Sequence, residues 1–190
     1  MNVHSLSIRP RIAFSGSAGI GKTTLARRLA AALGLPYLAE GMRQFLEAGG
    51  DLHALGPGGL RDLVLRLWEQ QRAAEDAAFR AFGGFVSDRS AFDIGAFWIY
   101  YGFAADDADT RRIFAETQDR TRYDVVWLLP WGAFPVEADG VRSSDPWRQL
   151  HVHVLIEGML ARAGAPVRRV TAGPVEARLA EVLAGTAMTA

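Results

Sequence analysis

Residues 16–23 of the chain have the sequence Gly-Ser-Ala-Gly-Ile-Gly-Lys-Thr, which matches the pattern G-x-x-x-x-G-K-[ST]. The apolar run Arg11-Ile-Ala-Phe-Ser15 precedes it, and leucines at helical spacing follow it from Lys22 to Leu33. The expected order is strand, glycine-rich loop and helix, the context in which this pattern binds phosphate. The glycines let successive backbone N–H groups point at phosphate oxygens, and the helix adds its positive dipole end. We interpret residues 16–23 as a phosphate-binding loop (P-loop).

The P-loop residues have expected roles toward a bound nucleotide. Lys22 is expected to neutralise the β and γ phosphates, and Thr23 to offer its hydroxyl to Mg²⁺. The alternative is a glycine-rich turn that contains a lysine by chance. The residues expected to bind the nucleotide are Gly16, Ser17, Ala18, Gly19, Ile20, Gly21, Lys22, Thr23 and Thr24.

Lys22 is the single lysine of the chain, against 20 arginines. The arginine excess reflects composition, but the position of the lysine indicates function, because a planar guanidinium cannot replace a compact ammonium between two phosphates. The same scarcity excludes the Asn-Lys-x-Asp motif of guanine-specific GTPases, since no lysine follows Lys22 and the single asparagine is Asn2.

Length and charge exclude several other classes of protein. The 190 residues suit one domain, expected over residues 1–190, and 21 basic and 21 acidic side chains cancel, which argues against a nucleic-acid partner. No apolar run reaches the roughly 18 residues of a membrane span, and the N-terminus lacks the apolar core of a signal peptide. With no cysteine, disulfides and thiolate chemistry are impossible. We therefore expect a cytoplasmic protein.

Apolar runs and helical periodicities alternate along the chain. Strands are expected at residues 11–15, 35–38, 84–88, 123–129 and 166–171. Helices are expected at residues 22–33, 42–48, 60–82, 92–101, 110–121, 147–163 and 174–183, followed by a flexible tail at 184–190. Strands that alternate with helices imply a parallel α/β sheet with right-handed crossovers.

Four segments carry a further pattern: GSAGIGKTTLARRLAAALGLPYLAEGMRQFL, GFVSDRSAFD, YDVVWLLPW and DGVRSSDPWRQLH. Together they resemble the P-loop kinases of nucleosides and nucleotides, most closely the AAA_28 group that includes the ribosylnicotinamide kinase domain of NadR. The resemblance implies a three-layer P-loop NTPase fold, with a five-stranded parallel sheet of order 2-3-1-4-5 and helices on both faces. It also implies ATP and Mg²⁺ as cofactors and an arginine-bearing lid, at residues 131–148.

Asp88 ends the third expected strand and Arg89 follows it, beside the P-loop strand, where open α/β sheets place their sites. By analogy with the family, Asp88 holds Mg²⁺ through water or accepts the proton of an acceptor hydroxyl, and the alternative is a helix N-cap. Arg89 is expected to reach phosphate or substrate, and the alternative is a surface ion pair. Asp93, about one and a half helical turns further on, is another substrate-binding candidate.

Glu40 follows the second expected strand, at a position where related nucleoside kinases carry an acidic residue that contacts the acceptor hydroxyl. Glu40 and Arg43 are spaced to meet on one helix face, and a plain surface salt bridge fits that spacing equally well. The sequence does not choose between Glu40 and Asp88 as general base.

The expected lid contains Arg142 and Arg148, and its length and composition suit a mobile loop. The resemblance implies that both arginines act as internal arginine fingers on the transferring phosphate. Trp131 is expected to line a pocket beneath the lid, and Gly173 lies where related kinases pass their backbone around adenine. The aromatic run 92–101 could stack on a base, although such helices more often pack in a core.

These expectations combine into an ATP- and Mg²⁺-dependent phosphotransferase that phosphorylates a hydroxyl of a nucleoside-like small molecule. Two alternatives stay open: a nucleotide-regulated switch that binds a protein or lipid headgroup, and a nucleoside monophosphate kinase. A homodimer is also left open. The expected catalytic residues are Lys22, Glu40, Asp88, Arg142 and Arg148; the expected substrate contacts are Arg43, Arg89, Asp93 and Trp131; the expected metal ligands are Thr23 and Asp88.

Overall fold

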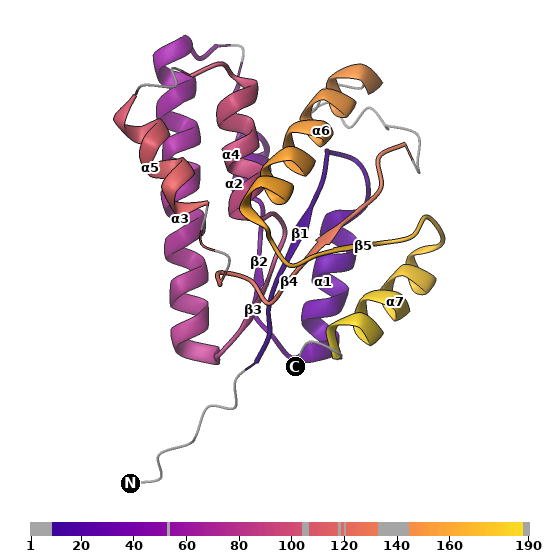
Figure 1. Ribbon diagram of the computed structural model, residues 1–190. Coiled ribbons are helices and arrows are strands. Elements are labelled where there is room, and N and C mark those ends of the chain that lie inside the picture. Colours follow the sequence, from indigo (N-terminus) through magenta and orange to yellow (C-terminus); the bar gives the residue numbers. More distant parts are fainter. Residues whose placement is uncertain are drawn as a thin grey trace, which may run out of the picture.

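The computed structural model describes residues 9–52, 54–103, 107–117, 119, 121–132 and 145–187. Its parallel strands form one five-stranded sheet in the order β2-β3-β1-β4-β5 (Figure 1). The strands are β1 (Arg11–Ser15), β2 (Tyr37–Leu38), β3 (Phe85–Ser87), β4 (Val125–Leu128) and β5 (Val167–Arg169). This order confirms the predicted 2-3-1-4-5 arrangement.

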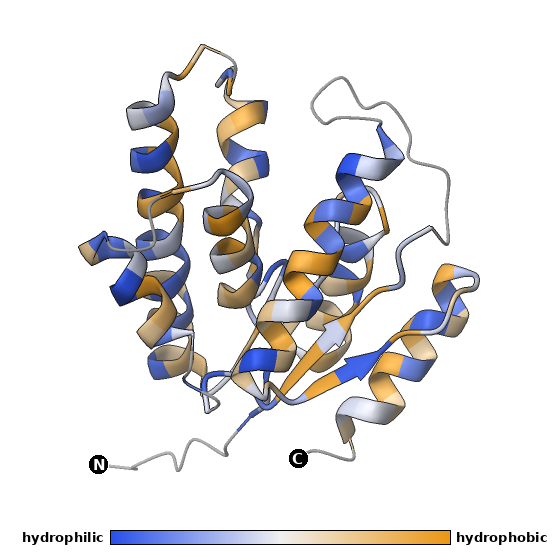
Figure 2. Cartoon of the chain, turned by 45° about the horizontal axis from the view of Figure 1, so that its top comes forward, coloured by the Kyte–Doolittle hydropathy of each residue, from blue (hydrophilic) through white to orange (hydrophobic). Residues whose placement is uncertain are grey.

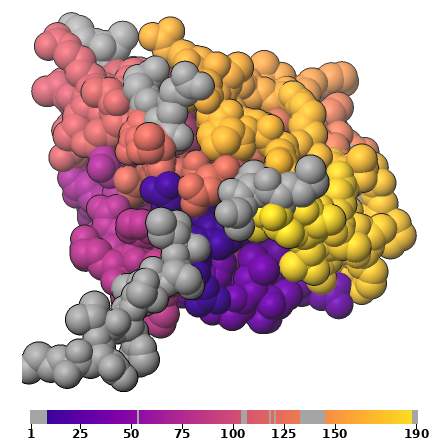
Figure 3. Space-filling model, turned by 60° about the horizontal axis from the view of Figure 1, so that its bottom comes forward, coloured from indigo at the N-terminus to yellow at the C-terminus, as the bar shows by residue number. Residues whose placement is uncertain are grey.

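Helices cover both faces of the sheet, as predicted (Figure 1). They are α1 (Lys22–Leu33), α2 (Gly41–Glu47), α3 (Pro57–Phe82), α4 (Ala91–Tyr100), α5 (Ala108–Glu116), α6 (Pro146–Ala163) and α7 (Val175–Ala187). Helices α3, α4 and α6 pack on one face, while α1 and α7 pack together on the other. In Figure 3 the yellow α7 lies against the purple α1.

The two central strands are apolar on both sides, which is why their sequences show no alternation of polar and apolar residues. In β1, Ile12 and Phe14 point toward α1 and α7, whereas Ala13 points toward α3 and α4. In β4, Val125 and Val126 divide between the two cores in the same way. Figure 2 shows the apolar colour of β4 running through the middle of the sheet. Helices on both faces are required to bury these strands.

The expectation of a flexible tail from residue 184 is wrong for the described residues, because α7 continues to Ala187. Gly185 lets the helix approach β4 closely, since a Cβ there would come within 2.4 Å of the Trp127 ring. The hydroxyl of Thr186 is buried and accepts the indole N–H of Trp127 at 3.3 Å. These contacts come from a distant strand, so local composition did not indicate them.

Two other helix limits differ from the prediction. Helix α3 begins at Pro57, a residue favoured at the first helical position because it lacks the N–H that would be unsatisfied there. Helix α5 ends at Glu116 rather than continuing to residue 121. Across the described residues, the helices are all too short or too polar to cross a membrane.

Candidate functional site

The P-loop lies between β1 and α1, at the carboxyl end of the central strand. Gly16 and Gly21 have φ values of 125° and 87°, which residues with a side chain rarely adopt. A Cβ on Gly16 would lie 2.6 Å from the Ile20 side chain. The glycines thus allow a tight loop that ends at the amino terminus of α1, where unpaired N–H groups and the helix dipole favour anions.

Lys22 opens α1 and is buried beneath this loop. Its ammonium donates a hydrogen bond back to the carbonyl of Ser17. Burial, followed by the nearby charge of Arg89, lowers the pKa of Lys22 to about 7. A bound polyphosphate would favour the charged ammonium and reverse this shift.

Asp88 and Thr23 meet beside the loop. The hydroxyl of Thr23 donates to Oδ2 of Asp88 at 2.5 Å, and the hydroxyl of Tyr37 donates to the same oxygen at 3.1 Å. Burial raises the pKa of Asp88, although the charge of Lys22 acts in the opposite direction. Burial, followed by the charge of Asp88, raises the pKa of Tyr37 to about 12. The second oxygen, Oδ1, is buried and has no hydrogen-bond partner among the described residues.

These oxygens suit Mg²⁺, which takes one or two protein oxygens and completes its shell with waters and substrate phosphates. The described residues contain no group of three or more His, Asp or Glu side chains that would bind a metal by itself. The pair of Thr23 and Asp88 therefore fits a metal ion that arrives with a nucleotide.

Arg89 is buried at the centre of the site. Its Nε donates to Oε1 of Glu40 at 2.6 Å, and its Nη1 donates to the Gly16 carbonyl at 2.9 Å and to Oδ1 of Asp93 at 3.0 Å. Burial alone would lower the pKa of Arg89, but Glu40 and Asp93 outweigh it and the pKa is raised. The alternative of a surface ion pair is thus wrong for Arg89, which is 4% exposed.

Asp93 lies in the first turn of α4 and is fully buried. Besides Arg89, it accepts the Ser15 hydroxyl at 2.5 Å, the Ser90 N–H at 3.1 Å and the Gly16 N–H at 3.2 Å. With Ser90 it forms a capping box. Its carboxylate therefore ties α4 to the P-loop, and a direct contact with substrate stays a prediction.

The structure separates the expected pair Glu40 and Arg43. Glu40, the residue before α2, is 5% exposed and forms its ion pair with Arg89. Arg43 points to the exposed side of α2, where it pairs with Glu47 at 2.6 Å. Of the two, Glu40 lines the main cavity and Arg43 does not.

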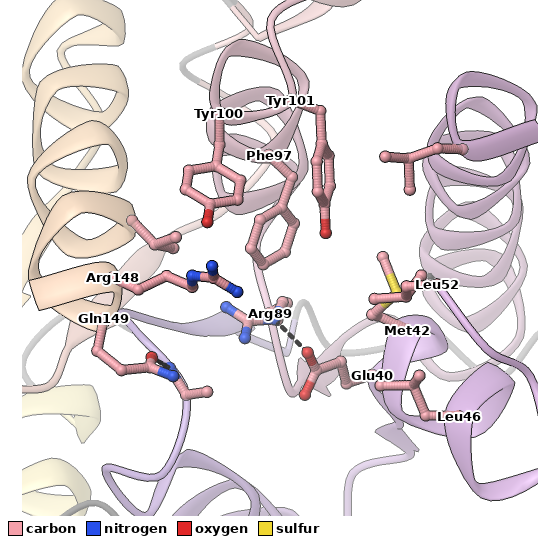
Figure 4. A pocket seen from close by; sticks show the side chains of 13 residues that line it. Glu40, Met42, Leu46, Leu52, Arg89, Phe97, Tyr100, Tyr101, Arg148 and Gln149 are labelled. Carbon is pink, nitrogen blue, oxygen red and sulfur yellow. Dashed lines mark hydrogen bonds and ion pairs between the residues drawn. The ribbon is translucent and has the colours of Figure 1, made fainter. Parts of the chain in front are cut away.

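The cavity lined by Glu40, referred to as the main cavity, has a volume of about 310 Å³, within the range of small-molecule sites. Figure 4 shows Phe97, Tyr100 and Tyr101 projecting from α4 toward Arg89, with Glu40 opposite and Arg148 entering from α6. Its lining residues are Ala18, Glu40, Met42, Leu46, Leu52, Leu60, Arg89, Phe97, Tyr100, Tyr101, Arg148, Gln149 and Val152. The P-loop residue Ala18 thus forms part of its wall.

The aromatic run of α4 serves both of the roles considered. Phe92 and Trp98 belong to the apolar core, as such helices usually do. Phe97, Tyr100 and Tyr101 lie on the other side of the helix and line the cavity. The ring of Phe97 also packs 4.8 Å from the Arg89 guanidinium, a cation–π contact.

The lid is described only at its ends. Arg142 lies outside the described residues, so its role stays a prediction. Arg148 lies in the first turn of α6 and not in a loop, because Asp145 caps the helix and Pro146 begins it. Trp131 lies in the turn after β4 and is not among the residues that line the main cavity. Gly173 lies between β5 and α7, with open space around it.

Three side chains that sequence reasoning missed contact the P-loop. Oε1 of Gln149 accepts the Ala18 N–H at 3.0 Å, and Nδ1 of His153 accepts the Ser17 N–H at 3.4 Å. Burial lowers the pKa of His153, which keeps the ring neutral and able to accept. From α7, Arg178 donates to the Ile20 carbonyl at 3.2 Å. The spacing of Gln149 and His153 at i and i+4 places them on one helix face, a signal the sequence offered.

The P-loop, the sheet order and the acidic residue that follows β3 define the fold of P-loop kinases. The chain belongs to the AAA_28 family, described as an AAA domain, whose match extends over residues 11–178. The recognised resemblance is thereby confirmed.

Individual relatives are kinases or kinase-like proteins. The cytidylate kinase of Granulibacter bethesdensis is 41% identical over 90 residues, which cover 37% of this chain and 43% of that protein. The structure of the NadR protein in complex with NAD and AMP-PNP matches with a TM-score of 0.73 at 22% identity, over 96% of this chain and 50% of that one. Deoxyadenosine kinase from M. mycoides matches with a TM-score of 0.62 at 14% identity, over 94% of this chain and 99% of that one. The chain thus spans about half the length of the first two relatives.

Proposed function

We propose that the protein is an ATP- and Mg²⁺-dependent phosphotransferase that phosphorylates a hydroxyl of a nucleoside-like small molecule. The observation that carries the proposal is the junction of P-loop and cavity, because Ala18 belongs to both. A nucleotide on the loop would present its terminal phosphate to a molecule in the cavity. Catalysis of phosphoryl transfer consists mainly of such positioning and of charge stabilisation.

The nucleotide side of the site uses Lys22, Thr23 and the amides at the start of α1. In the proposal Lys22 neutralises the terminal phosphates, and Thr23 and Asp88 would hold Mg²⁺, which would supply positive charge to the phosphate oxygens. The hydroxyl of Thr23, in the loop, lies within hydrogen-bond distance of the carboxylate of Asp88. In the proposal the phosphates bind backbone N–H groups of the loop other than those of Gly16, Ser17 and Ala18, which donate to Asp93, His153 and Gln149.

The acceptor side uses the cavity. We assign the general base to Glu40, because its carboxylate lines the cavity, whereas Asp88 lies beside Thr23 and is assigned to Mg²⁺. The rings of Phe97, Tyr100 and Tyr101 suit a planar base, by stacking and by apolar contact. A nucleoside-like acceptor would place its ribose hydroxyls near Glu40 and Arg89.

Arg148 supplies the positive charge that Arg89 cannot, since Arg89 is already neutralised by two carboxylates. The structure gives Arg148 no ion pair with any described residue, and its guanidinium enters the cavity (Figure 4). In the proposal it stabilises the charge on the transferring phosphoryl group. Arg142 is assigned the same role.

The test is transfer of labelled phosphate from ATP to a panel of acceptors, with Mg²⁺ present and then chelated. The panel includes nicotinamide riboside, cytidine and deoxyadenosine. Glu40→Gln is the informative variant. It is expected to lower kcat while the KM for ATP changes little. ATP binding without a phosphorylated product from any acceptor would exclude the proposed activity.

A nucleoside monophosphate kinase is the second candidate, favoured by Arg148, which lines the cavity without an ion pair to any described residue, and by the likeness to a cytidylate kinase. An acceptor phosphate would then bind Arg148. Adding CMP and thymidylate to the panel separates the candidates, because Arg148→Ala should raise the KM of a monophosphate acceptor but lower kcat for a nucleoside.

A further inference from the structure

The segment Asp88-Arg89-Ser90 has an unusual backbone. Arg89 has a φ of 152°, and no other non-glycine residue in the described ranges has a positive φ. Such a conformation costs on the order of 1–3 kcal/mol and persists only where the surroundings over-determine it. The side chain of Arg89 is held by Glu40, Gly16 and Asp93, so the remaining question is what holds its main chain.

Gln71, on the buried face of α3, contacts this segment from behind. Its Nε2 lies 2.6 Å from the hydroxyl oxygen of Ser87, 3.2 Å from the carbonyl of Arg89 and 2.7 Å from Oε1 of Glu75. Ser87 and Arg89 flank Asp88 on both sides. The amide has two N–H groups to share among these three acceptors. Two of the acceptors, on Ser87 and Arg89, lie immediately before and after the carboxylate assigned to Mg²⁺.

Tyr123 completes the attachment at the other end of the segment. Its hydroxyl accepts the Ala91 N–H at 2.7 Å and donates to Oε1 of Glu75 at 2.8 Å. Glu75 in turn accepts Arg122 Nε at 2.6 Å through its other oxygen. The Gln71 amide and the Tyr123 hydroxyl thus both lie within hydrogen-bond distance of Oε1 of Glu75, which joins the two residues in a single network.

We propose that Gln71, Glu75 and Tyr123 are positioning residues that hold the strained Asp88-Arg89-Ser90 segment in its active geometry. The inference rests on the proposed function for its kinetic part. None of the three is among the residues that line the main cavity. Gln71 borders a smaller pocket beside Glu40 and Arg89, but its volume of about 20 Å³ is no more than that of about one water molecule. The three residues therefore act through Asp88 and Arg89 and not on the substrate.

The helix pattern shows that these polar residues are not needed for packing. The buried positions of α3 around them are apolar, namely Leu63, Val64, Leu67, Trp68 and Ala78. Gln71 and Glu75 interrupt this stripe where residues 87–91 pass, and Glu75 is 1% exposed. Burying a carboxylate is costly, so apolar residues of similar volume would serve stability at least as well.

Two variants remove the network contacts without changing side-chain shape greatly. Tyr123→Phe keeps the ring packed against Phe85 and Phe92 and loses only the hydroxyl. Gln71→Leu loses the amide donors. Both are expected to lower kcat by about ten-fold while the KM for ATP changes less than about two-fold, because the P-loop itself is untouched.

Thr186→Val is the matched control. It also deletes a buried hydroxyl, the acceptor of the Trp127 N–H, but on the opposite face of the sheet. The positioning role is excluded if kcat in Tyr123→Phe and Gln71→Leu stays within two-fold of that of the unsubstituted protein. It is also excluded if kcat falls no further than in Thr186→Val at an equal loss of thermal stability.

Hydrogen exchange followed by mass spectrometry supplies a readout that needs no turnover. Gln71→Leu removes no hydrogen bond that is donated by a backbone N–H group. The backbone amides of residues 87–93 should nevertheless exchange faster in this variant, while Thr186→Val leaves them unchanged. Unchanged exchange in Gln71→Leu would overturn the inference. If the unsubstituted protein phosphorylates no acceptor, the proposed function fails, and the exchange data still decide whether the network holds this segment.

Discussion

The two halves of the site are built in opposite ways. In the nucleotide half, formed by Lys22, Thr23 and Asp88, some buried polar atoms have no hydrogen-bond partner among the described residues. Oδ1 of Asp88 and the nearby hydroxyl of Ser17 are buried without a hydrogen bond to any described residue, and Lys22 has a pKa of about 7. In the acceptor half, formed by Glu40, Arg89 and Asp93, the charged groups are joined by ion pairs of 2.6 and 3.0 Å.

This difference indicates in which half a ligand supplies the missing hydrogen-bond partners. Buried polar atoms without partners are costly, so the nucleotide half is expected to gain stability and charge when phosphate and metal arrive. The acceptor half is already compensated and is expected to be rigid before the acceptor binds. Substitutions in the nucleotide half should therefore impair turnover without unfolding the protein, whereas substitutions in the acceptor half should impair folding.

Arg89→Met should have the largest effect. It removes the guanidinium and leaves Glu40 and Asp93 as buried carboxylates without their shared cation. Breaking a buried ion pair in this way typically costs about 3–5 kcal/mol. Urea unfolding measures the loss, and Arg43→Met, which removes an exposed ion pair with Glu47, is the control. A loss in Arg89→Met no greater than in the control would show that the acceptor half is not prearranged.

Lys22→Arg tests the nucleotide half. The guanidinium keeps the charge but does not fit the space of a compact ammonium beneath the loop. We expect kcat to fall by about 100- to 1,000-fold, the usual effect of losing one prearranged charge donor, with little change in the midpoint of thermal unfolding. Initial-rate kinetics and a thermal melt check both expectations. A near-normal rate would be incompatible with the role given to Lys22.

The lowered pKa of Lys22 predicts a proton linked to nucleotide binding. Above pH 7 the free protein carries mostly neutral Lys22, and a bound polyphosphate raises the pKa again, so binding takes up a proton and affinity falls as pH rises. At about pH 8 the uptake should approach roughly 0.9 of a proton, and at about pH 6 it should be small. Calorimetry in two buffers of different ionisation enthalpy measures it.

Lys22→Arg is the control for that titration as well, because arginine stays charged throughout this range. Uptake of equal size in the variant would assign the proton to another group. His153, whose pKa is lowered by burial, and Asp88, whose pKa is raised, are the neighbours whose titration that result would implicate.

Sequence reasoning was most accurate where the determinants are local. The strand at Arg11–Ser15 and the helix at Lys22–Leu33 were predicted with the observed limits, because apolar run, glycines and leucine spacing lie within two dozen residues. The order of the sheet followed from the resemblance. Arg89 and Glu40 were both named as candidates, but not as a pair, because 49 residues separate them.

The missed parts of the site depend on what a helix face contacts, which spacing alone does not encode even where it places Gln149 and His153 on one face. Gln149, His153 and Arg178 reach the P-loop from positions 131 to 158 residues away along the chain. Only docking of α6 and α7 onto the sheet brings them there. Arg148 belonged to both the expected lid, residues 131–148, and the expected helix, residues 147–163. The structure places it in the helix, which Asp145 caps.

Substitution of Arg43, which lies at the edge of the acceptor half, should have the smallest effect on stability and turnover. Its guanidinium pairs with Glu47 on the exposed side of α2, one turn away from the buried Glu40. Exposed pairs of this kind contribute about 0.3–0.5 kcal/mol, so Arg43→Ala should leave stability nearly unchanged. The KM for the acceptor should change by less than about two-fold, since the side chain does not line the cavity. A five-fold or larger rise in that KM would mean that the acceptor extends over α2, and that Arg43 binds it as the sequence predicted.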